Sequence, residues 1–316
     1  MTPSETPKTA EILDVSSYDK FDYDYKEYWN ERGYENAAEA NALANLLKKS
    51  RGARFLDVGG SFGRNLPLYA GKYDEVVIID YSLNTLLKYE KEILNRFPNA
   101  RLVAGNIYKM PFAKGSFDGA LMVRVLHHIE NPALYYKELS QIMAQNGLYI
   151  QEFANKMHIK AVLKWLLKRD FSKFNQLPYQ QPTTDEKQGS EDAGIFYNFH
   201  PKHIKQLLKE NDFKITAKRN CSYLRVPFLK RLLGNGLLIT FEKLFQATLS
   251  WTDITPSIIY KTRKLSGSKA NSTKAFKEIL VCPTCKKGLN VDQDEAICPE
   301  CNTKYKKYST VWDLRA

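Results

Sequence analysis

Two aspartates, Asp57 and Asp80, lie at or near the ends of apolar runs, where a carboxylate can meet a ligand. Asp57 lies in the run FLDV and is followed by a tight turn, Gly59-Gly60-Ser61-Phe62-Gly63. Glycines let this backbone turn and let a ligand approach bare peptide groups at a helix start, so Asp57 can meet a cation there. Asp80, followed by Tyr81, ends the run EVVIID 17 positions after Gly63. A carboxylate at the tip of a second parallel strand can accept hydrogen bonds from two vicinal ribose hydroxyls.

Four cysteines near the end of the chain have the spacing of a metal site. The pairs Cys282-x2-Cys285 and Cys298-x2-Cys301 are separated by twelve residues, and each pair can direct two thiolates at one ion. A segment of about 40 residues has too little core to fold alone, so a metal would supply most of its stability. Disulfides are the alternative, which a cytosolic location disfavours. The pattern predicts a closed, structural Zn²⁺ site without a catalytic role.

The elements that must position these residues alternate between strand and helix. We expect a helix to begin at Gly63, directly after the first turn. A further amphipathic helix, at 37–48, precedes the first strand. Alternation of this kind is typical of an α/β fold with a parallel sheet, which binds ligands at the carboxyl ends of its strands. The apolar runs predict strands at 55–58, 75–80, 100–104, 117–123 and 147–153, with a helix at 133–144.

The order of these motifs resembles that of class I S-adenosylmethionine (SAM) methyltransferases. The spacing D-x-G-x-S-x-G has Ser61 where a dinucleotide fingerprint needs a glycine, and FDGALMVRVLHHI at 117–129 is similar to ubiquinone and menaquinone methyltransferases. The resemblance covers residues 40–155. It implies that Asp57 faces the ammonium end of SAM and that Asp80 binds its ribose. The cofactor contacts expected are Asp57, Gly59, Gly60, Ser61, Gly63, Asp80, Tyr81, Asn106, Ile107 and Arg124.

The same resemblance implies a Rossmann-like, seven-stranded sheet closed by an antiparallel hairpin, 213–219 and 256–264. We expect an N-terminal helical lid (1–50), with Tyr28, Trp29 and Arg32 as candidates to cover the site. The further divisions expected are a SAM-binding core (51–155), cap insertions with the closing strands (156–265), a linker (266–275) and a zinc ribbon (276–316). The ribbon is similar to the small zinc-ribbon activator subunit of tRNA and translation-factor methyltransferases, here fused in cis.

No catalytic dyad stands out in the sequence. A methyl group on a sulfonium is already activated, so such an enzyme chiefly needs in-line positioning and a dry site. His127 and His128, after the fourth strand, are candidates for a general base; the alternative is that they only begin a helix near SAM. Arg124 is a candidate to bind an acidic group of the substrate or of SAM; a structural salt bridge is the alternative.

Composition separates the chain into a neutral and a basic part. The net charge of +12 is −2 over residues 1–155, +8 over 156–259 and +6 over 260–316. This asymmetry favours an anionic partner, namely RNA, a phosphorylated metabolite or a membrane surface, unless it is only a solvated lysine-rich surface. The start of the chain lacks the pattern of a signal peptide, and no run of about 18 apolar residues predicts a membrane span, so we expect a cytoplasmic protein.

Three functions follow as hypotheses. The favoured one is methyl transfer from SAM to a small or lipid-like acceptor. The second is methylation of tRNA or rRNA, with the basic cap and the ribbon binding phosphates. The third is a SAM-binding scaffold without turnover, which the intact motif around Asp57 and Asp80 disfavours.

Overall fold

The computed structural model describes residues 25–30, 32–180, 196–271 and 274–315. Residues 1–24 of the expected lid and most of the polar stretch after Gln180 lie outside this part. Within it, no helix is both long and apolar enough to cross a membrane.

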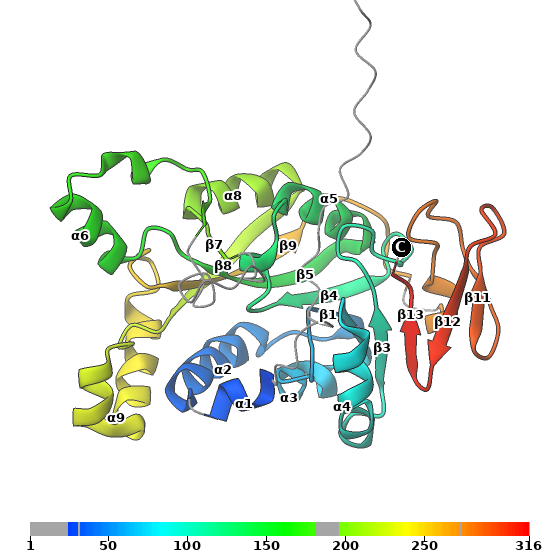
Figure 1. The fold of residues 1–316 in the computed structure, drawn as a ribbon, viewed down its shortest axis with the longest axis horizontal. Helices are drawn as coiled ribbons and strands as arrows, with labels where there is room; N and C mark the ends of the chain where they lie inside the picture. The colour runs from blue at the N-terminus through cyan, green and yellow to red at the C-terminus, as the bar shows by residue number, and fades with distance from the viewer. Residues whose placement is uncertain (1–24, 31, 181–195, 272–273, 316) are drawn as a thin grey trace, which may run out of the picture.

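One large sheet organises the molecule (Figure 1). Five parallel strands form its middle, and two further strands close one side. The strand Ser257–Lys264 runs antiparallel to the five, and the strand Phe213–Cys221 pairs antiparallel with it and so runs parallel to the five. Buried on both faces, the parallel strands read as continuous apolar runs. The sheet confirms the Rossmann-like, seven-stranded fold. Its strands run in the order β3 (Ala100–Ala104), β2 (Tyr73–Asp80), β1 (Gly52–Val58), β4 (Phe117–Met122), β5 (Met143–Ala154), β9 (Ser257–Lys264) and β8 (Phe213–Cys221).

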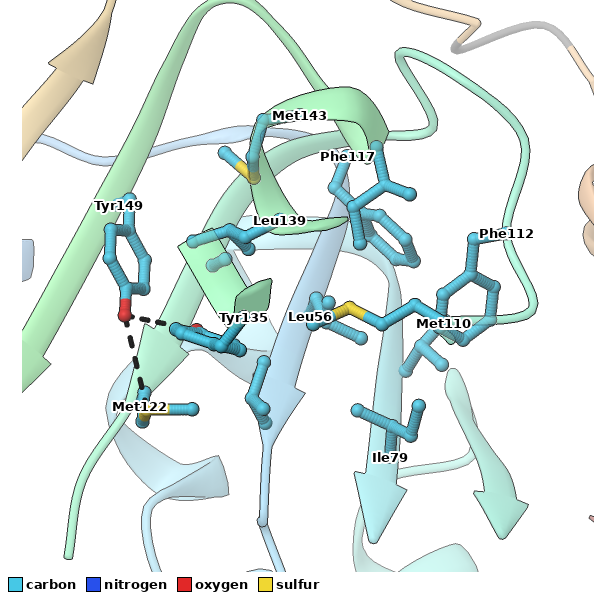
Figure 2. Close-up of a cluster of buried hydrophobic side chains, with 14 of the residues drawn as sticks. Leu56, Ile79, Met110, Phe112, Phe117, Met122, Tyr135, Leu139, Met143 and Tyr149 are labelled. Atoms are coloured by element: carbon cyan, nitrogen blue, oxygen red, sulfur yellow. Dashed lines mark hydrogen bonds between the residues drawn. The ribbon is translucent and has the colours of Figure 1, made fainter. Parts of the chain in front are cut away.

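Helices cover both faces of this sheet, so the core has two halves. On one face lie α2 (Gly33–Leu47), α3 (Leu66–Tyr69) and α4 (Leu83–Arg96), which pack on the side chains of Phe55, Val76 and Ile78. On the other lie α5 (Pro132–Ile142) and α8 (Pro201–Glu210). Figure 2 shows part of this second half, where Leu56 and Ile79 of the sheet meet Tyr135 and Leu139 of α5. Alternate residues of each strand therefore pack on opposite faces of the sheet.

The turn after β1 differs from the prediction. Gly59, Ser61 and Gly63 all have positive φ, at 68°, 47° and 73°. A residue at such an angle cannot belong to an α-helix, so the expectation that Gly63 opens a helix is wrong. The helix begins at Leu66, three residues later, after a turn closed by the bond from the Gly63 N–H to the Gly60 carbonyl. Ser61 takes a left-handed conformation that glycine usually fills.

The cysteine-rich end continues the main sheet. Its strands β10 (Asn290–Val291), β11 (Glu295–Ile297), β12 (Lys304–Tyr308) and β13 (Val311–Asp313) follow the short helix η5 (Phe276–Ile279). β13 pairs in parallel with β3, with Trp312 opposite Val103, and the sheet thus has eleven strands. Phe276, Ile279, Trp312 and Leu314 are buried in the same core half as Leu56. The expected ribbon is therefore packed on the methyltransferase-like sheet.

The stretch expected as a linker is also attached to the sheet's end. The Ser268 carbonyl accepts from the Gln145 N–H at 2.8 Å, and the Gly115 carbonyl accepts from the Asn271 N–H at 3.0 Å.

Two insertions project from one end of the molecule, on the left of Figure 1. They are α6 (Ile159–Leu167), followed by η4 (Phe171–Phe174), and α9 (Pro227–Thr248), which is interrupted at Gly234. A two-stranded sheet, β6 (Tyr179–Gln180) with β7 (Tyr197–Asn198), lies between them in sequence. The remaining short elements are α1 (Tyr25–Asn30), η2 (Ala70–Lys72) and η3 (Leu126–His128).

Candidate active site

A cavity of about 810 Å³ lies at the carboxyl ends of β1, β2, β4 and β5. This is where open α/β sheets bind ligands, and the volume lies within the roughly 300–1,000 Å³ of small-molecule sites. Of the residues expected at a cofactor, the cavity wall includes Asp57, Gly59, Gly60, Ser61, Asp80, Tyr81, Ile107 and Arg124. Gly63 and Asn106 are not on this wall.

The glycine turn leaves no space for larger side chains. A Cβ at Gly59 would lie 2.3 Å from Val125 Cγ2, and one at Gly60 would lie 2.8 Å from Ile78 Cγ2. The Asp80 carboxylate fastens this turn to β2, because Oδ2 accepts from the Ser61 N–H and Oδ1 from the Ser82 N–H, each at 3.0 Å. The buried Ser61 hydroxyl has no hydrogen-bond partner among the described residues. A bare backbone beside an unpaired hydroxyl suits a polar ligand.

Asp57 is a buried carboxylate beside the same turn. It is 2% exposed and accepts a hydrogen bond from the Tyr69 hydroxyl. Burial raises the pKa of Asp57 to about 7, although the Tyr69 hydrogen bond and the Arg64 charge act to lower it. Removal of a carboxylate from water disfavours its charged form. The group is thus poised to ionise when a cation arrives.

Asn106 is engaged elsewhere. Its side-chain oxygen accepts from the Tyr108 N–H at 2.9 Å, a local turn that asparagine often forms. The expected contact of this oxygen with an adenine amine therefore has a competitor, whereas the neighbouring Ile107 does line the cavity.

A charged cluster beside the cavity was missed in the sequence. Glu39 of α2 is fully buried and pairs with Arg64 and with Arg124, whose Nε lies 2.8 Å from Glu39 Oε2. Burial raises the pKa of Glu39, but the two guanidinium groups outweigh it and leave the pKa below its ordinary value. Arg124 also donates its backbone N–H to Glu152 of β5 at 3.1 Å. Arg124 is therefore held in a structural ion pair, with φ at 62°.

Two signals pointed to this cluster. Glu39 falls on the apolar face of its helix, in register with Leu43 and Leu46, and Glu152 lies near the end of β5, two residues before its last residue, Ala154.

The N-terminal helices bring aromatic rings to the cavity. Tyr28 and Trp29 of α1 line it. The Arg64 guanidinium lies 3.9 Å from the centre of the Trp29 ring. Arg32 instead stacks on Tyr28, 4.0 Å from the ring centre, and is not on the wall.

His127 and His128, at the end of η3, also line the cavity. The His127 ring is buried and packs on Phe196, with ring centres 4.3 Å apart, and on His128 at 4.1 Å. Burial, together with the charges of His128 and Arg124, holds the pKa of His127 well below its ordinary value. His127 is therefore neutral at neutral pH and can accept a hydrogen bond or a proton.

The four ribbon thiols converge on one point. Their sulfur atoms all lie within 4.8 Å of one another, with Cys282–Cys301 at 3.7 Å and Cys285–Cys298 at 3.3 Å. These separations exceed a disulfide bond of about 2.05 Å. They suit a tetrahedral ion with bonds of about 2.3 Å, which sets its sulfurs about 3.8 Å apart. The Tyr305 hydroxyl lies 3.2 Å from Cys282 Sγ.

Comparison with known proteins agrees with this geometry. Residues 56–151 match the family model of a methyltransferase domain. The chain carries a methyltransferase domain. This match agrees with the methyltransferase predicted from the sequence, and the fold is the one expected of it.

Relatives of the methyltransferase domain include two curated proteins. A demethylmenaquinone methyltransferase of Renibacterium salmoninarum is 31% identical over 105 residues, which are 33% of this chain and 43% of that protein. An uncharacterized protein of Methanocaldococcus jannaschii is 26% identical over 203 residues, 63% of this chain and 75% of that protein. The chain thus spans less than half of the length of the first relative.

Solved structures share the fold of the methyltransferase domain. A protein of Listeria monocytogenes, assigned as a SAM-dependent methyltransferase, has a TM-score of 0.54 at 16% identity and covers 74% of this chain and 100% of its own. The 1,6-didemethyltoxoflavin-N1-methyltransferase of Burkholderia thailandensis, solved with S-adenosylhomocysteine and its substrate, has a TM-score of 0.50 at 15% identity, covering 77% and 84%.

Proposed function

We propose that this protein transfers the methyl group of SAM to a small or lipid-like acceptor that enters the same cavity. The observation that carries the proposal is the continuity of this cavity. Its lining includes the turn with Asp57 and Asp80, and also Phe196, Ile159 and Ile254. Polar groups that suit the cofactor and apolar side chains that suit the acceptor thus line one cavity. The Renibacterium relative is a demethylmenaquinone methyltransferase, and this supports an apolar acceptor.

The residues divide the work of binding. When bound, SAM supplies a methyl group already activated on a sulfonium, so the protein has to align it and exclude water. In our proposal Asp57 pairs with the ammonium group and Asp80 accepts from the ribose hydroxyls, while the unpaired Ser61 hydroxyl offers a further hydrogen bond. Arg124 positions the wall through Glu39 and Glu152.

The acceptor side needs little chemistry from the protein. Phe196 and His127, whose rings stack on each other, give the cavity wall an aromatic patch that a planar or apolar acceptor can contact. Because His127 stays neutral, it can accept a hydrogen bond from an acceptor hydroxyl and take its proton as the methyl group is transferred.

We further propose that Cys282, Cys285, Cys298 and Cys301 bind one structural Zn²⁺. The sulfur spacing supports this, and all four protein ligands leave no open position for catalysis. The resemblance to a zinc-ribbon activator subunit fits this role, because the ribbon's strand β13 pairs with β3 of the main sheet and so supports it.

Cofactor binding is expected to depend on pH. In the free protein the pKa of Asp57 is about 7, and an ammonium partner would lower it. Below pH 7 the cofactor must displace a proton, so affinity should fall as pH falls, to about tenfold weaker at pH 6 than at pH 8. Calorimetric titration of S-adenosylhomocysteine across this range tests it. Asp57→Asn should bind weakly with little pH dependence; an equal slope in that variant contradicts the assignment.

Methyl transfer can be followed with radiolabelled SAM. We expect label from wild-type protein to enter the organic phase of a cell lipid extract, and little label to enter bulk tRNA or rRNA. Asp80→Ala serves as the cofactor-site control and should abolish most transfer. Label found chiefly in RNA would replace the small-acceptor proposal by the RNA hypothesis. SAM binding without transfer to either fraction would support the scaffold hypothesis.

A further inference from the structure

The two insertions present an apolar surface to solvent. We call the exposed side chains of residues 159–177 and 225–254 the α6–α9 face; these segments form the left end of Figure 1. Leu167 is 86% exposed and Trp251 80%. Large side chains so exposed are costly unless something covers them. The exposed apolar side chains of this face include Leu163, Leu167, Phe171, Phe228, Leu232 and Trp251.

The inner side of α6 is already packed, so its outer leucines are not needed for folding. Trp165 is buried, with its ring 5.9 Å from that of Phe174 and 6.0 Å from that of Tyr179. Leu163 and Leu167 remain outside this packing. The helix is thus apolar on a side that the described residues leave uncovered.

Basic side chains surround the exposed apolar ones. Residues 159–177 contain five Lys or Arg and one Asp, and residues 225–254 contain four Lys or Arg, one Glu and one Asp. The glutamate, Glu242, is buried. No described carboxylate forms an ion pair with Lys164, Lys168 or Arg169. The whole region 156–259 carries +8 even with the acidic residues of 181–195 included.

This combination matches one class of partner. Leucine, phenylalanine and tryptophan on one side of a helix, with lysines beside them, are the pattern of helices that lie in a membrane interface. Anionic headgroups attract the lysines, and the acyl region takes the apolar side chains. RNA would match the charges, and Phe171, Phe228 and Trp251 could stack on bases, but the exposed leucines among them offer no aromatic face and are explained only by an apolar partner.

The cavity opens on this face. Among its described wall residues, the exposed ones are Ile159, Lys160, Arg225 and Ile254, and all of them belong to the α6–α9 face. The two segments meet there, because the Ile159 N–H donates to the Ile254 carbonyl at 2.9 Å and Lys160 Nζ donates to the Arg225 carbonyl at 3.0 Å. An apolar acceptor could pass from a bilayer into the cavity without crossing water.

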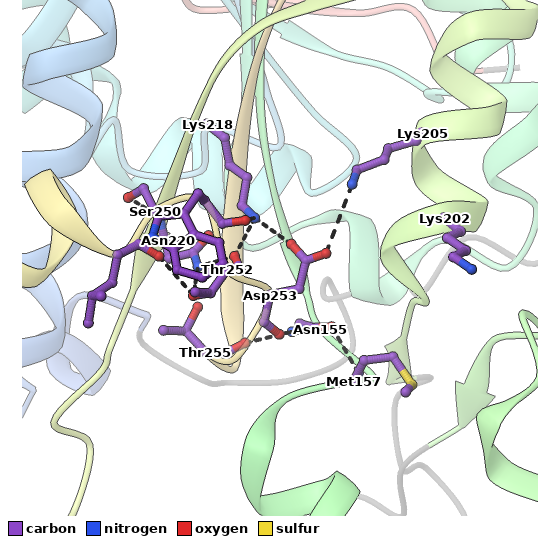
Figure 3. Close-up of polar contacts among 12 residues, drawn as sticks. Asn155, Met157, Lys202, Lys205, Lys218, Asn220, Ser250, Thr252, Asp253 and Thr255 are labelled. Atoms are coloured by element: carbon purple, nitrogen blue, oxygen red, sulfur yellow. Dashed lines mark hydrogen bonds and ion pairs between the residues drawn. The ribbon is translucent and has the colours of Figure 1, made fainter.

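The loop that carries Trp251 and Ile254 is firmly held. Asn155 Nδ2 donates to the Asp253 carbonyl at 2.6 Å and to the Thr255 carbonyl at 2.8 Å, and Lys218 pairs with Asp253 (Figure 3). Asn220 Nδ2 donates to the Thr252 carbonyl at 2.6 Å. Because residues of β5 and β8 hold this loop, the side chains of Trp251 and Ile254 keep a fixed position relative to the cavity.

We propose that the α6–α9 face binds the surface of an anionic phospholipid membrane, with the mouth of the cavity against the lipid. Binding of this kind is peripheral and does not require methyl transfer, so it can be tested separately from the proposed function.

Flotation of the full-length protein with vesicles tests the proposal. Vesicles of phosphatidylcholine with phosphatidylglycerol should carry the protein upward at physiological salt, and vesicles of phosphatidylcholine alone should carry at least fivefold less. Leu167→Gln with Trp251→Gln should weaken binding at least tenfold, and Lys164→Gln with Lys168→Gln should weaken it severalfold. The matched controls, Leu265→Gln and Lys304→Gln with Lys306→Gln, are exposed residues away from this face and should bind as wild type does.

Binding of S-adenosylhomocysteine in the absence of vesicles shows that each variant is folded and keeps the cofactor site. Four results would overturn the proposal: no flotation with anionic vesicles, equal binding by the Leu167/Trp251 variant, tRNA binding at physiological salt that competes with vesicles, or a dimer in solution that the same variant dissociates. Loss of methyl transfer alone would bear on the proposed function only.

Discussion

Replacing Cys298 and Cys301 by serine is expected to remove the bound zinc and to destabilise the whole protein. Structural zinc contributes about 10–16 kcal/mol of apparent binding energy in zinc-finger peptides. Here the ribbon is part of the main sheet, because β13 pairs with β3 and the Leu314 N–H donates to the Ala104 carbonyl at 2.8 Å. Trp312 is buried in the same core as the strands. Loss of the ion should therefore lower stability by several kcal/mol, a large part of the total for a domain.

Metal analysis and thermal unfolding with and without a chelator measure this effect. Wild-type protein should contain one zinc per chain, and the chelator should lower its unfolding temperature. Cys221→Ala is the matched control, because Cys221 is buried far from the ribbon in sequence and packs in the other half of the core. Zinc retained by the double serine variant, or unchanged unfolding after complete removal of the metal, would contradict the prediction.

Deletion of residues 270–316 bears on the same point. From the sequence alone, the ribbon lies after all cofactor motifs, so deletion should leave SAM binding intact. The structure changes this expectation: Arg315 Nη1 donates to the Tyr81 carbonyl beside Asp80 at 3.3 Å, and Arg54 Nη2 donates to the Lys274 carbonyl at 2.7 Å. Deletion would expose the edge of β3 and buried side chains of the sheet, and we expect poor folding.

Asp80→Ala is expected to weaken cofactor binding about 5- to 150-fold. An unpaired polar group in a partly dry site costs about 1–3 kcal/mol, and a factor of ten corresponds to about 1.4 kcal/mol. Two losses combine here. The ribose hydroxyls would lose their acceptor, and the Ser61 N–H would lose the bond that fastens the glycine turn to β2.

Calorimetric titration of S-adenosylhomocysteine measures this loss. Asp74→Ala is the matched control, since Asp74 is an exposed aspartate at the opposite end of the same strand; its affinity should equal that of wild type. Asp80→Asn keeps one acceptor oxygen and should fall between the two. Affinity of Asp80→Ala within twofold of wild type would show that Asp80 does not hold the cofactor.

Much of the fold could be predicted from the sequence because its signals are local. Apolar runs such as EVVIID report burial on both faces, and Asp80 stands at the strand end where the pattern places it. The strand at 100–104 has the predicted bounds. The cysteine spacing likewise predicts four convergent thiols, since two short turns need no distant partner. Residue type and spacing along the chain were enough to predict these features.

Other features depend on contacts between distant segments. Glu39 reaches Arg124 across 85 residues, and only the packing of α2 beside the strand ends decides that pairing. The start of α3 is delayed because three alternate positions of the turn, at Gly59, Ser61 and Gly63, have positive φ. Backbone angles of this kind do not follow from residue type alone when a serine occupies one of them.

The sequence by itself determined the parallel sheet, the acidic strand ends and the cysteine cluster, because each follows from residue spacing and apolar patterns within a short stretch of the chain. Only the tertiary structure decided that the ribbon joins the sheet and that the cavity opens on the α6–α9 face. The edge of β3 has unpaired backbone groups that any strand can satisfy, and no residue pattern in β13 specifies that edge. Likewise, exposed leucines on α6 are distinguished from core leucines only once Trp165 is seen to occupy the inner side.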